Sequence, residues 1–333
     1  MRDRPDAALL CLVDPSPVAK PLAIDLGVPW YGSVQEMLQA RDIPDAAIVC
    51  TPNSTHVSIS IELLKAGVHV LVEKPIATTI ADAHQLVDFA RSSGKKLLVG
   101  HHRRFNPYIT ATKRALSEKA IGKVIAVSGL WTAYKPASYF EGPGAWRTKA
   151  GNGGPLLINM IHEIDLLHYL FGPITRVHAE RTIPQRGHES EEGAAILLRF
   201  ASGVVGTFLL SDATPSPHNF EGGTGENPMV TKTGKDFYRI FGSAGTLSVG
   251  DMQISRFTEG QPKSWSSSFE ESTVAVGSEI PFDEQVSHLV RVVRGGEEPR
   301  CTGEDGLRAL VVVDAIKCAT VSEHAVSVRS TKL

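Results

Sequence analysis

The stretch from Asp45 to Gly100 constrains the fold of this chain more than any other. An apolar run over residues 46–50 is followed by a helical pattern and then by a second apolar run that begins at His69. Short Val- and Ile-rich runs separated by one helix predict a β-α-β unit with buried parallel strands. Ligands of such sheets bind at the carboxyl ends of the strands, where Thr51-Pro-Asn53 and Glu73-Lys-Pro75 stand.

Lys74 follows the second of these predicted strands directly. Its ammonium must reach water, a partner charge or a substrate. If the ammonium is partly desolvated, its pKa falls towards neutrality and it can exchange a proton with a hydroxyl or a carbonyl. The alternative is a solvated lysine in a turn before Pro75, and the residue taken alone leaves both readings open.

The same alternation of strands and helices extends over the first hundred residues. Further strands are predicted near residues 7–13, 29–31 and 95–100, and helices near 17–25, after Ser33 and over 79–93. This pattern predicts a doubly wound, Rossmann-type α/β domain with a parallel sheet over residues 1–106. Asp14, at the end of an early strand, is either a ligand for the adenosine ribose or the cap of a turn or helix.

The first strand of such a domain and its phosphate-binding loop are missing from the pattern. No Gly-x-Gly-x-x-Gly spacing precedes Asp14. We therefore expect a chain that lacks a first β-α unit of roughly 25 to 30 residues. Such a chain should bind NAD poorly, because it lacks the backbone amides and helix terminus that hold the pyrophosphate.

The pattern changes after Pro107, where a run of strands joined by tight turns begins. These strands predict an α+β domain over residues 107–333 with a large, mostly antiparallel open sheet. Residues 215–235, rich in Gly, Asn and Pro, are its least structured stretch, and two helical patterns close the chain at 282–294 and 303–320. An uncovered sheet face would expose apolar side chains, so we expect a homodimer or homotetramer formed through this sheet.

Within this second domain, residues 156–170 read as a helix, and Trp146-Arg147 precedes it. Asn159, His162 and Glu163 share one face of that helix because they are spaced by three and four residues. His162 is a candidate general acid or base, or a ligand for a substrate hydroxyl. The alternative is a buried histidine bonded to the backbone. No second ligand has suitable spacing for a metal, so we predict none.

Composition excludes several functional classes. The chain has 333 residues and a net charge of -2, so it has no broad basic surface for nucleic acid or membrane lipids. Four cysteines lie far apart without metal or redox spacing, which suits a cytoplasmic protein. No run approaches the ~18 to 20 apolar residues of a membrane span.

Taken together, the motifs resemble those of the Gfo/Idh/MocA oxidoreductases, the family of glucose-fructose oxidoreductase and inositol 2-dehydrogenase. The resemblance covers nearly the whole chain. It rests on the following motifs in this order: Thr51-Pro-Asn53 with His56, Gly67-Val-His-Val-Leu-Val-Glu-Lys-Pro75, Gly100-His-His-Arg-Arg-Phe-Asn-Pro107, Trp146-Arg147, and Gly153-Gly-Pro-Leu-Leu157 followed by His162 and Asp165.

The resemblance implies a nicotinamide-dependent dehydrogenase that acts on a sugar, cyclitol or related polyol. Lys74 and His162 would be the catalytic pair for proton transfer. The implied cofactor-binding residues are Asp14, Thr51, Pro52, Asn53, His56, Glu73, Lys74, His102 and Arg103. The implied substrate residues are Arg103, Trp146, Arg147, Asn159 and His162. An acidic residue at position 14 favours NAD over NADP, since it would repel a 2′-phosphate, although NADP stays possible.

Two departures from the family pattern leave an alternative open. Many members carry an aspartate four residues before the helix histidine, where this chain has Ile158. Asn159, next to it, can donate a hydrogen bond but cannot take up a proton. Together with the absent glycine loop, this favours as the alternative a non-catalytic or cofactor-impaired relative that binds a sugar-like ligand or a partner.

Overall fold

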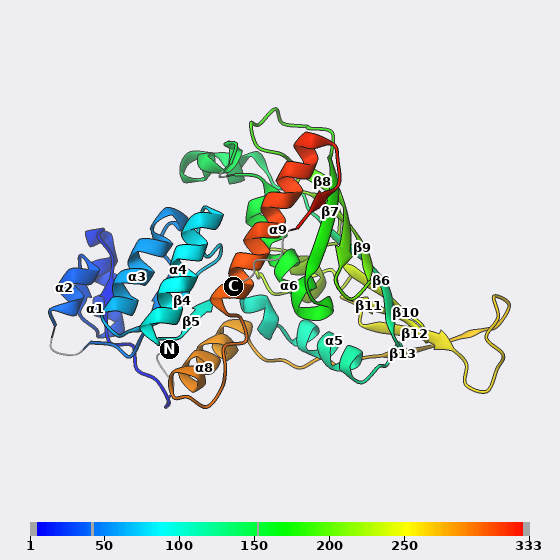
Figure 1. Ribbon diagram of the computed structural model, residues 1–333, viewed down its shortest axis with the longest axis horizontal. Coiled ribbons are helices and arrows are strands. Elements are labelled where there is room, and N and C mark those ends of the chain that lie inside the picture. Colours follow the sequence, from blue (N-terminus) through cyan, green and yellow to red (C-terminus); the bar gives the residue numbers. More distant parts are fainter. Residues whose placement is uncertain (1–4, 41–42, 152, 329–333) are drawn as a thin grey trace. The chain divides into compact units, whose positions relative to one another are not determined.

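The computed structural model describes residues 5–40, 43–151 and 153–328, and its chain divides into two compact units (Figure 1). The first unit contains the chain up to His101 and Phe282–Leu307, and the second contains His102–Pro281 and the chain from Arg308 onward. The sequence analysis had placed the boundary at residue 106 and had assigned 282–307 to the second domain.

Residues 282–307 belong to the first unit because they pack against its parallel strands. Helix α8 (Pro281–Val293) buries Leu289 and Val292 in one cluster with Leu71 and Leu98 of the parallel strands. Helix α9 (Gly303–Ser322) then starts against the same sheet, since a Cβ on Gly303 would lie 2.8 Å from Leu97. These contacts join segments about two hundred residues apart, which no local pattern reveals.

The first unit has the expected alternation of strands and helices. Its strands are β1 Leu12–Val13, β2 Trp30–Tyr31, β3 Ala46–Val49, β4 His69–Val72 and β5 Leu97–Val99. Its helices before α8 are η1 Pro17–Ala19, α1 Lys20–Leu26, α2 Val34–Leu38, η2 Asn53–Thr55, α3 His56–Lys65 and α4 Ile80–Ser93. All its strand pairs are parallel, which confirms the Rossmann-type assignment.

The strands of this unit form two separate sheets, with orders β1-β2 and β3-β4-β5. Strands β4 and β5 are buried as predicted, but Ile48 of β3 is 38% exposed. Within the described residues, β1 and β3 do not pair with each other. The absence of a first β-α unit stays a prediction.

The second unit contains one nine-stranded sheet with the order β13-β12-β11-β10-β6-β9-β8-β7-β14. Its strands are β6 Val124–Thr132, β7 Ile174–Arg181, β8 Gly193–Phe200, β9 Val205–Ser211, β10 Tyr238–Gly242, β11 Thr246–Val249, β12 Gln253–Phe257, β13 Phe269–Thr273 and β14 Val326–Ser327. Every pair is antiparallel except β6 with β9. The mostly antiparallel sheet is thus confirmed, although the sequence analysis did not anticipate β12, β13 and β14.

Figure 1 shows α6 beside this sheet. The helices of the second unit before α9 are η3 His102–Phe105, α5 Pro107–Ser117, η4 Ala137–Phe140, η5 Gly142–Thr148, η6 Leu156–Met160, α6 Ile161–Phe171 and α7 Phe220–Thr224. Helix α6 packs on the sheet through Phe171, whose ring centroid lies 5.7 Å from that of Phe200 on β8. Along β8, buried and exposed residues alternate, so the opposite face of the sheet is open.

The helix predicted over residues 156–170 consists of two parts with different geometry. Residues Leu156–Met160 form a π-helical turn, and the α-helix starts at Ile161. A π-turn changes the direction in which its side chains point and often occurs at functional sites. As a result, Asn159 and Glu163 contact different partners, although the sequence placed them on one face.

Candidate active site

In the first unit, the carboxyl ends of β3, β4 and β5 are aligned. The amide of Glu73 donates to Val49 O at 2.8 Å, and the amide of Gly100 donates to Val72 O at 2.7 Å. Lys74 is the second residue after β4 and is partly buried, and its bond to Pro75 is cis. The predicted strand-end position of Lys74 is therefore confirmed.

Glu73 lies beside Lys74 and uses space left by a glycine. A Cβ on Gly100 would lie 2.7 Å from Glu73 Oε1, so any larger residue at position 100 would displace this carboxylate. Glu73 Oε2 accepts a hydrogen bond from the Lys74 amide at 3.2 Å. Because position 100 is a glycine, the Glu73 carboxylate has room to lie beside the carboxyl ends of β4 and β5.

His56 has a structural role that differs from the predicted one. It is 1% exposed, and its Nδ1 and Nε2 lie 2.8 Å and 2.9 Å from the carbonyl oxygens of Pro75 and Thr51. Both ring nitrogens thus contact backbone, and the side chain braces the loops after β3 and β4. Its assignment as a cofactor-binding residue stays a prediction, and the neighbouring Pro52 and Asn53 are accessible.

The geometry of Asp14 suits both roles that the sequence left open, a turn cap and a ligand for the adenosine ribose. Its Oδ1 accepts the amide of Ser16 at 2.7 Å, as in a turn. No bond to Oδ2 occurs among the described residues, so this oxygen can accept a ribose hydroxyl. With the Asn53 amide and the hydroxyl of Thr51, the first unit offers polar groups that fit the sugar hydroxyls of a dinucleotide.

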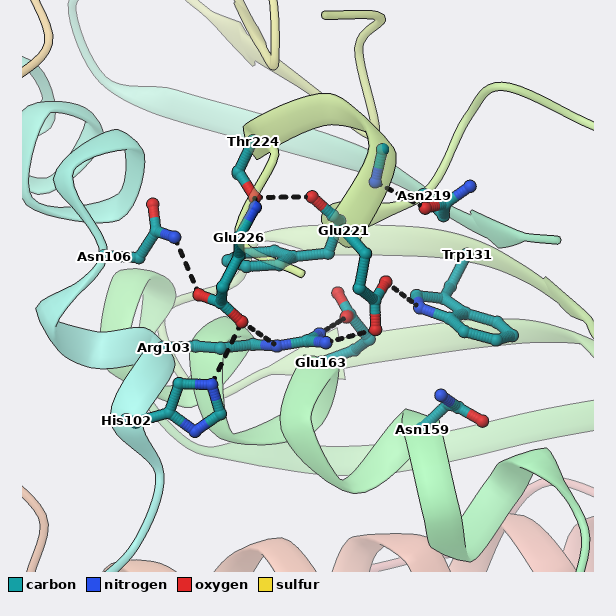
Figure 2. A network of polar contacts seen from close by, with 12 residues as sticks. His102, Arg103, Asn106, Trp131, Asn159, Glu163, Asn219, Glu221, Thr224 and Glu226 are labelled. Carbon is teal, nitrogen blue, oxygen red and sulfur yellow. Dashed lines mark hydrogen bonds and ion pairs between the residues drawn. The ribbon is translucent and has the colours of Figure 1, made fainter. Parts of the chain in front are cut away.

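The second unit buries a cluster of charges around Arg103, which we call the arginine cluster (Figure 2). Arg103 is 4% exposed, and its guanidinium lies 2.7 Å from Glu163, 2.5 Å from Glu221 and 3.4 Å from Glu226. Burial by itself would lower the pKa of Arg103, but these carboxylates raise it above its usual range. Glu163 and Glu221 accept hydrogen bonds from Arg103, and Glu226 adds a longer ion pair at Nε, so Arg103 organises the protein side of the site.

Glu163 is the least solvated acid of this cluster. Burial raises the pKa of Glu163 to about 7, against the opposing effects of Arg103 and of the Tyr238 hydroxyl, which donates to it. The arginine cluster therefore contains an acid that titrates near neutrality.

His102 and Asn106 complete the cluster through Glu226. His102 Nε2 lies 3.0 Å from Glu226 Oε1, and Asn106 Nδ2 donates to Oε2 at 2.7 Å. Burial by itself would raise the pKa of Glu226, but the bonds from His102 and the charge of Arg103 hold it below its usual range. The predicted cofactor residue His102 is thus bonded to a glutamate within its own unit.

His162 is 6% exposed, and its ring centroid lies 5.7 Å from that of His102 in an edge-to-face arrangement. About one helical turn after His162, Asp165 forms a bidentate pair with Arg104, accepting from Nε at 2.9 Å and from Nη2 at 2.7 Å. This buried pair fixes α6 against η3, and with it the position of His162.

The remaining predicted substrate residues gather around the segment 134–148. Asn159 Oδ1 accepts from Lys135 Nζ at 2.7 Å, and the Arg147 guanidinium lies 4.0 Å from the centroid of the Tyr139 ring. Trp146 is 44% exposed. A Cβ on Gly153 would lie 2.0 Å from Arg147 O, so only glycine allows the chain to pass there.

Sequence reasoning missed Lys135, Glu221, Glu226 and Tyr238. The two glutamates come from residues 215–235, which instead fold into α7 and its flanks. A local signal was present, because Asn219 stands three residues before Gly222 and its Oδ1 accepts that amide at 2.8 Å as a helix cap. Lys135 and Tyr238 had no such signal, since their role depends on contacts far along the chain.

Two classes of site are absent from the described part of the chain. No group of three or more His, Cys, Asp or Glu residues there could hold a metal ion. None of the helices described combines the length and apolar character that a bilayer crossing requires.

Comparisons with known proteins agree with this architecture. Residues 1–101 match the oxidoreductase family profile for an NAD-binding Rossmann fold, and residues 113–328 match that for the family's C-terminal alpha/beta domain. The 1,5-anhydro-D-fructose reductase of Ensifer adhaerens is 26% identical, with 90% of this chain and 84% of that protein covered. The scyllo-inositol 2-dehydrogenase (NAD(+)) of Bacillus subtilis is also 26% identical, with 90% and 83% covered.

The WlbA dehydrogenase from Bordetella pertussis, solved in complex with NADH and UDP-GlcNAcA, has the same fold with a TM-score of 0.76. It is 24% identical, and the match covers 97% of this chain and 91% of that one. The fold, the polar residues after the parallel strands and the two family matches lead to one conclusion: the chain belongs to the Gfo/Idh/MocA oxidoreductase family and is an NAD-binding oxidoreductase.

Proposed function

We propose that this protein oxidises a secondary hydroxyl of a sugar, cyclitol or related polyol, or reduces the corresponding carbonyl, with Lys74 and His162 moving the proton. The observation that carries the proposal is Lys74 itself, which follows β4 at the aligned strand ends of an NAD-binding fold. The named relatives act on an anhydrosugar and an inositol, which supports this substrate class.

NAD, when bound, supplies the hydride acceptor or donor. Asp14 Oδ2 would bind a ribose hydroxyl, and Asn53 and Glu73, which follow β3 and β4, would line the cofactor. Lys74 takes the proton from the substrate hydroxyl during oxidation and returns it during reduction. His162 binds the reacting oxygen and assists that transfer, so its loss affects both binding and turnover.

The alternative of a non-catalytic relative has no support among the relatives, which are dehydrogenases and reductases. The absent aspartate at Ile158 does not remove the acid-base pair of the proposal. We further propose that the protein works in the cytoplasm as a homo-oligomer.

The test is a dehydrogenase screen across cyclitols, aldoses and sugar acids with NAD and NADP, followed by variants on the best substrate. Lys74→Ala should lower kcat by about a hundredfold or more, the usual range for lost acid-base catalysis. His162→Ala should lower kcat less and raise KM. Lys123→Ala, an exposed lysine at the start of the sheet, is the control and should leave both constants unchanged. Wild-type turnover in Lys74→Ala would remove Lys74 from the mechanism.

A further inference from the structure

Lys135 is a buried lysine to which nothing above assigns a function. It follows β6, and its side chain is 11% exposed. Its Nζ lies 4.7 Å from the ring centroid of Tyr139 and 5.2 Å from that of Trp131. A lysine enclosed by aromatic rings requires an explanation, because an ammonium is strongly hydrated in water.

The hydrogen bonds of Lys135 are incomplete. An ammonium has three N–H donors. Asn159 Oδ1 accepts from Nζ at 2.7 Å, and Asp212 Oδ2 forms an ion pair with it at 3.6 Å. Among the partners that the described residues provide, one donor is thus left for a ligand.

The same bond fixes the amide of Asn159. Since its Oδ1 accepts from Lys135, its Nδ2 is left as a donor, and no bond from Nδ2 occurs among the described residues. Asn159 is 8% exposed and stands on the π-helical turn just before α6, three residues ahead of His162. Lys135 and Asn159 therefore present donors and no acceptor.

Lys135 shares its nearest carboxylate with an arginine. Asp212 lies 3.6 Å from Lys135 Nζ, and Arg186 Nη1 lies 2.7 Å from Asp212 Oδ1. Glu192 contacts the same guanidinium at 3.5 Å, and Arg147 adds a further positive charge beside Tyr139. The negative charge of Asp212 is thus divided between Lys135 and Arg186.

The protonation of Lys135 reflects this environment. Burial lowers the pKa of Lys135 to about 8, and the charges of Asp212 and Glu221 offset only part of the effect. An anion bound at Nζ would favour the charged form and raise the pKa again. A neutral hydroxyl would accept a hydrogen bond from Nζ but would bring no negative charge to favour the charged form.

We propose that Lys135 and Asn159 form a carboxylate-binding subsite, so that the substrate is an acidic sugar or polyol. One carboxylate oxygen would accept from Lys135 Nζ, and the other from Asn159 Nδ2. The subsite rests on the proposed function, because it names the substrate class of that same reaction.

The first experiment compares matched pairs of probes, D-glucuronate with D-glucose and D-galacturonate with D-galactose, as substrates with NAD and NADP. The wild type should prefer the acids by roughly tenfold to a hundredfold in kcat/KM, the range for hydrogen bonds to charged groups. Lys135→Gln, which keeps a donor for Asn159 but has no charge, should lose this preference. Lys149→Met, an exposed lysine paired with Glu189, is the matched control and should behave as wild type.

A second measurement decides the subsite without turnover. Competitive acetylation of the lysines with trace acetic anhydride over a pH series reports the pKa and reactivity of Lys135. D-glucuronate or D-galacturonate should raise that pKa and slow the labelling of Lys135, and the neutral sugars should do neither.

The two experiments fail separately. If no probe or polyol is turned over with either cofactor, the proposed function is wrong, and the acetylation result still decides the subsite. A preference for neutral probes, an equal loss on both classes in Lys135→Gln, or labelling that neither acid slows would overturn the carboxylate subsite.

Discussion

Glu163 shares one guanidinium with two other carboxylates, so its protonation depends on burial more than on its ion pair. Burial raises the pKa of Glu163 from the ordinary 4.5 to about 7. The folded state therefore keeps a proton that the unfolded chain has released. Its contribution to stability is full below pH 4.5 and is lost as the pH rises to about 7.

Glu163→Gln, which resembles the neutral acid, should remove this dependence. Between pH 4.5 and 7.5, the wild type should lose up to ~3 kcal/mol of unfolding free energy relative to the variant. Urea unfolding over that pH range measures the difference. Glu259→Gln at an exposed position is the control and should follow the wild type. Parallel pH curves for the wild type and Glu163→Gln would contradict the prediction.

At the scale of elements, residues 219–226 form a strap whose attachment is electrostatic. Glu221 and Glu226 pair with Arg103, and Trp131 Nε1 donates to Glu221 Oε2 at 2.8 Å. Helix α7 is a short element, so its order depends on these contacts more than on its own helical bonds. Figure 2 shows both glutamates directed from the strap towards the guanidinium.

Glu226→Gln should loosen this strap, because it removes the charge that Arg103 and His102 face. Hydrogen exchange of the Gly223 and Gly225 amides, which donate to Asn219 O and Glu221 O at 2.8 Å each, should accelerate by roughly tenfold or more. Exchange in α5 should not change, and Glu270→Gln on the exposed strand β13 should leave both regions as in the wild type. Unchanged exchange of the α7 amides would show that the strap is held by packing instead.

At the scale of the whole molecule, the open face of the nine-stranded sheet is apolar enough to need a partner. Leu197 on β8 is 52% exposed and Leu209 on β9 is 40% exposed. Both line a shallow hollow of about 360 Å³ on that face. Exposed apolar surface of this kind usually marks an interface between chains.

We therefore expect a dimer or tetramer in sedimentation at micromolar concentration. Introducing Leu197→Lys and Leu209→Lys together should shift it towards the monomer, because buried unpaired charges destabilise an interface. Val18→Lys, at an 83% exposed position of the first unit, is the control and should leave the assembly intact. A wild-type monomer would refute the interface.

The sequence by itself determined the two fold types and the strand-end position of Lys74. These features depend on local periodicity and on turn residues that end each strand, so neighbouring residues suffice to predict them. The cap of helix α2 also depends on neighbouring residues. Ser33, which precedes α2, accepts the Glu36 amide at 3.2 Å as a helix cap, although the Glu36 carboxylate bonds to the Gly32 amide, one residue earlier than a capping box requires.

Only the tertiary structure decided what the charged side chains do. Arg103, predicted to face ligand, is neutralised by glutamates from α6 and from the strap, and the His56 ring contacts two backbone carbonyls. Lys135 meets Asn159 because a π-turn directs that amide towards it. The physical reason is that the pKa and the partners of a buried charge depend on groups distant in the sequence, which periodicity does not report.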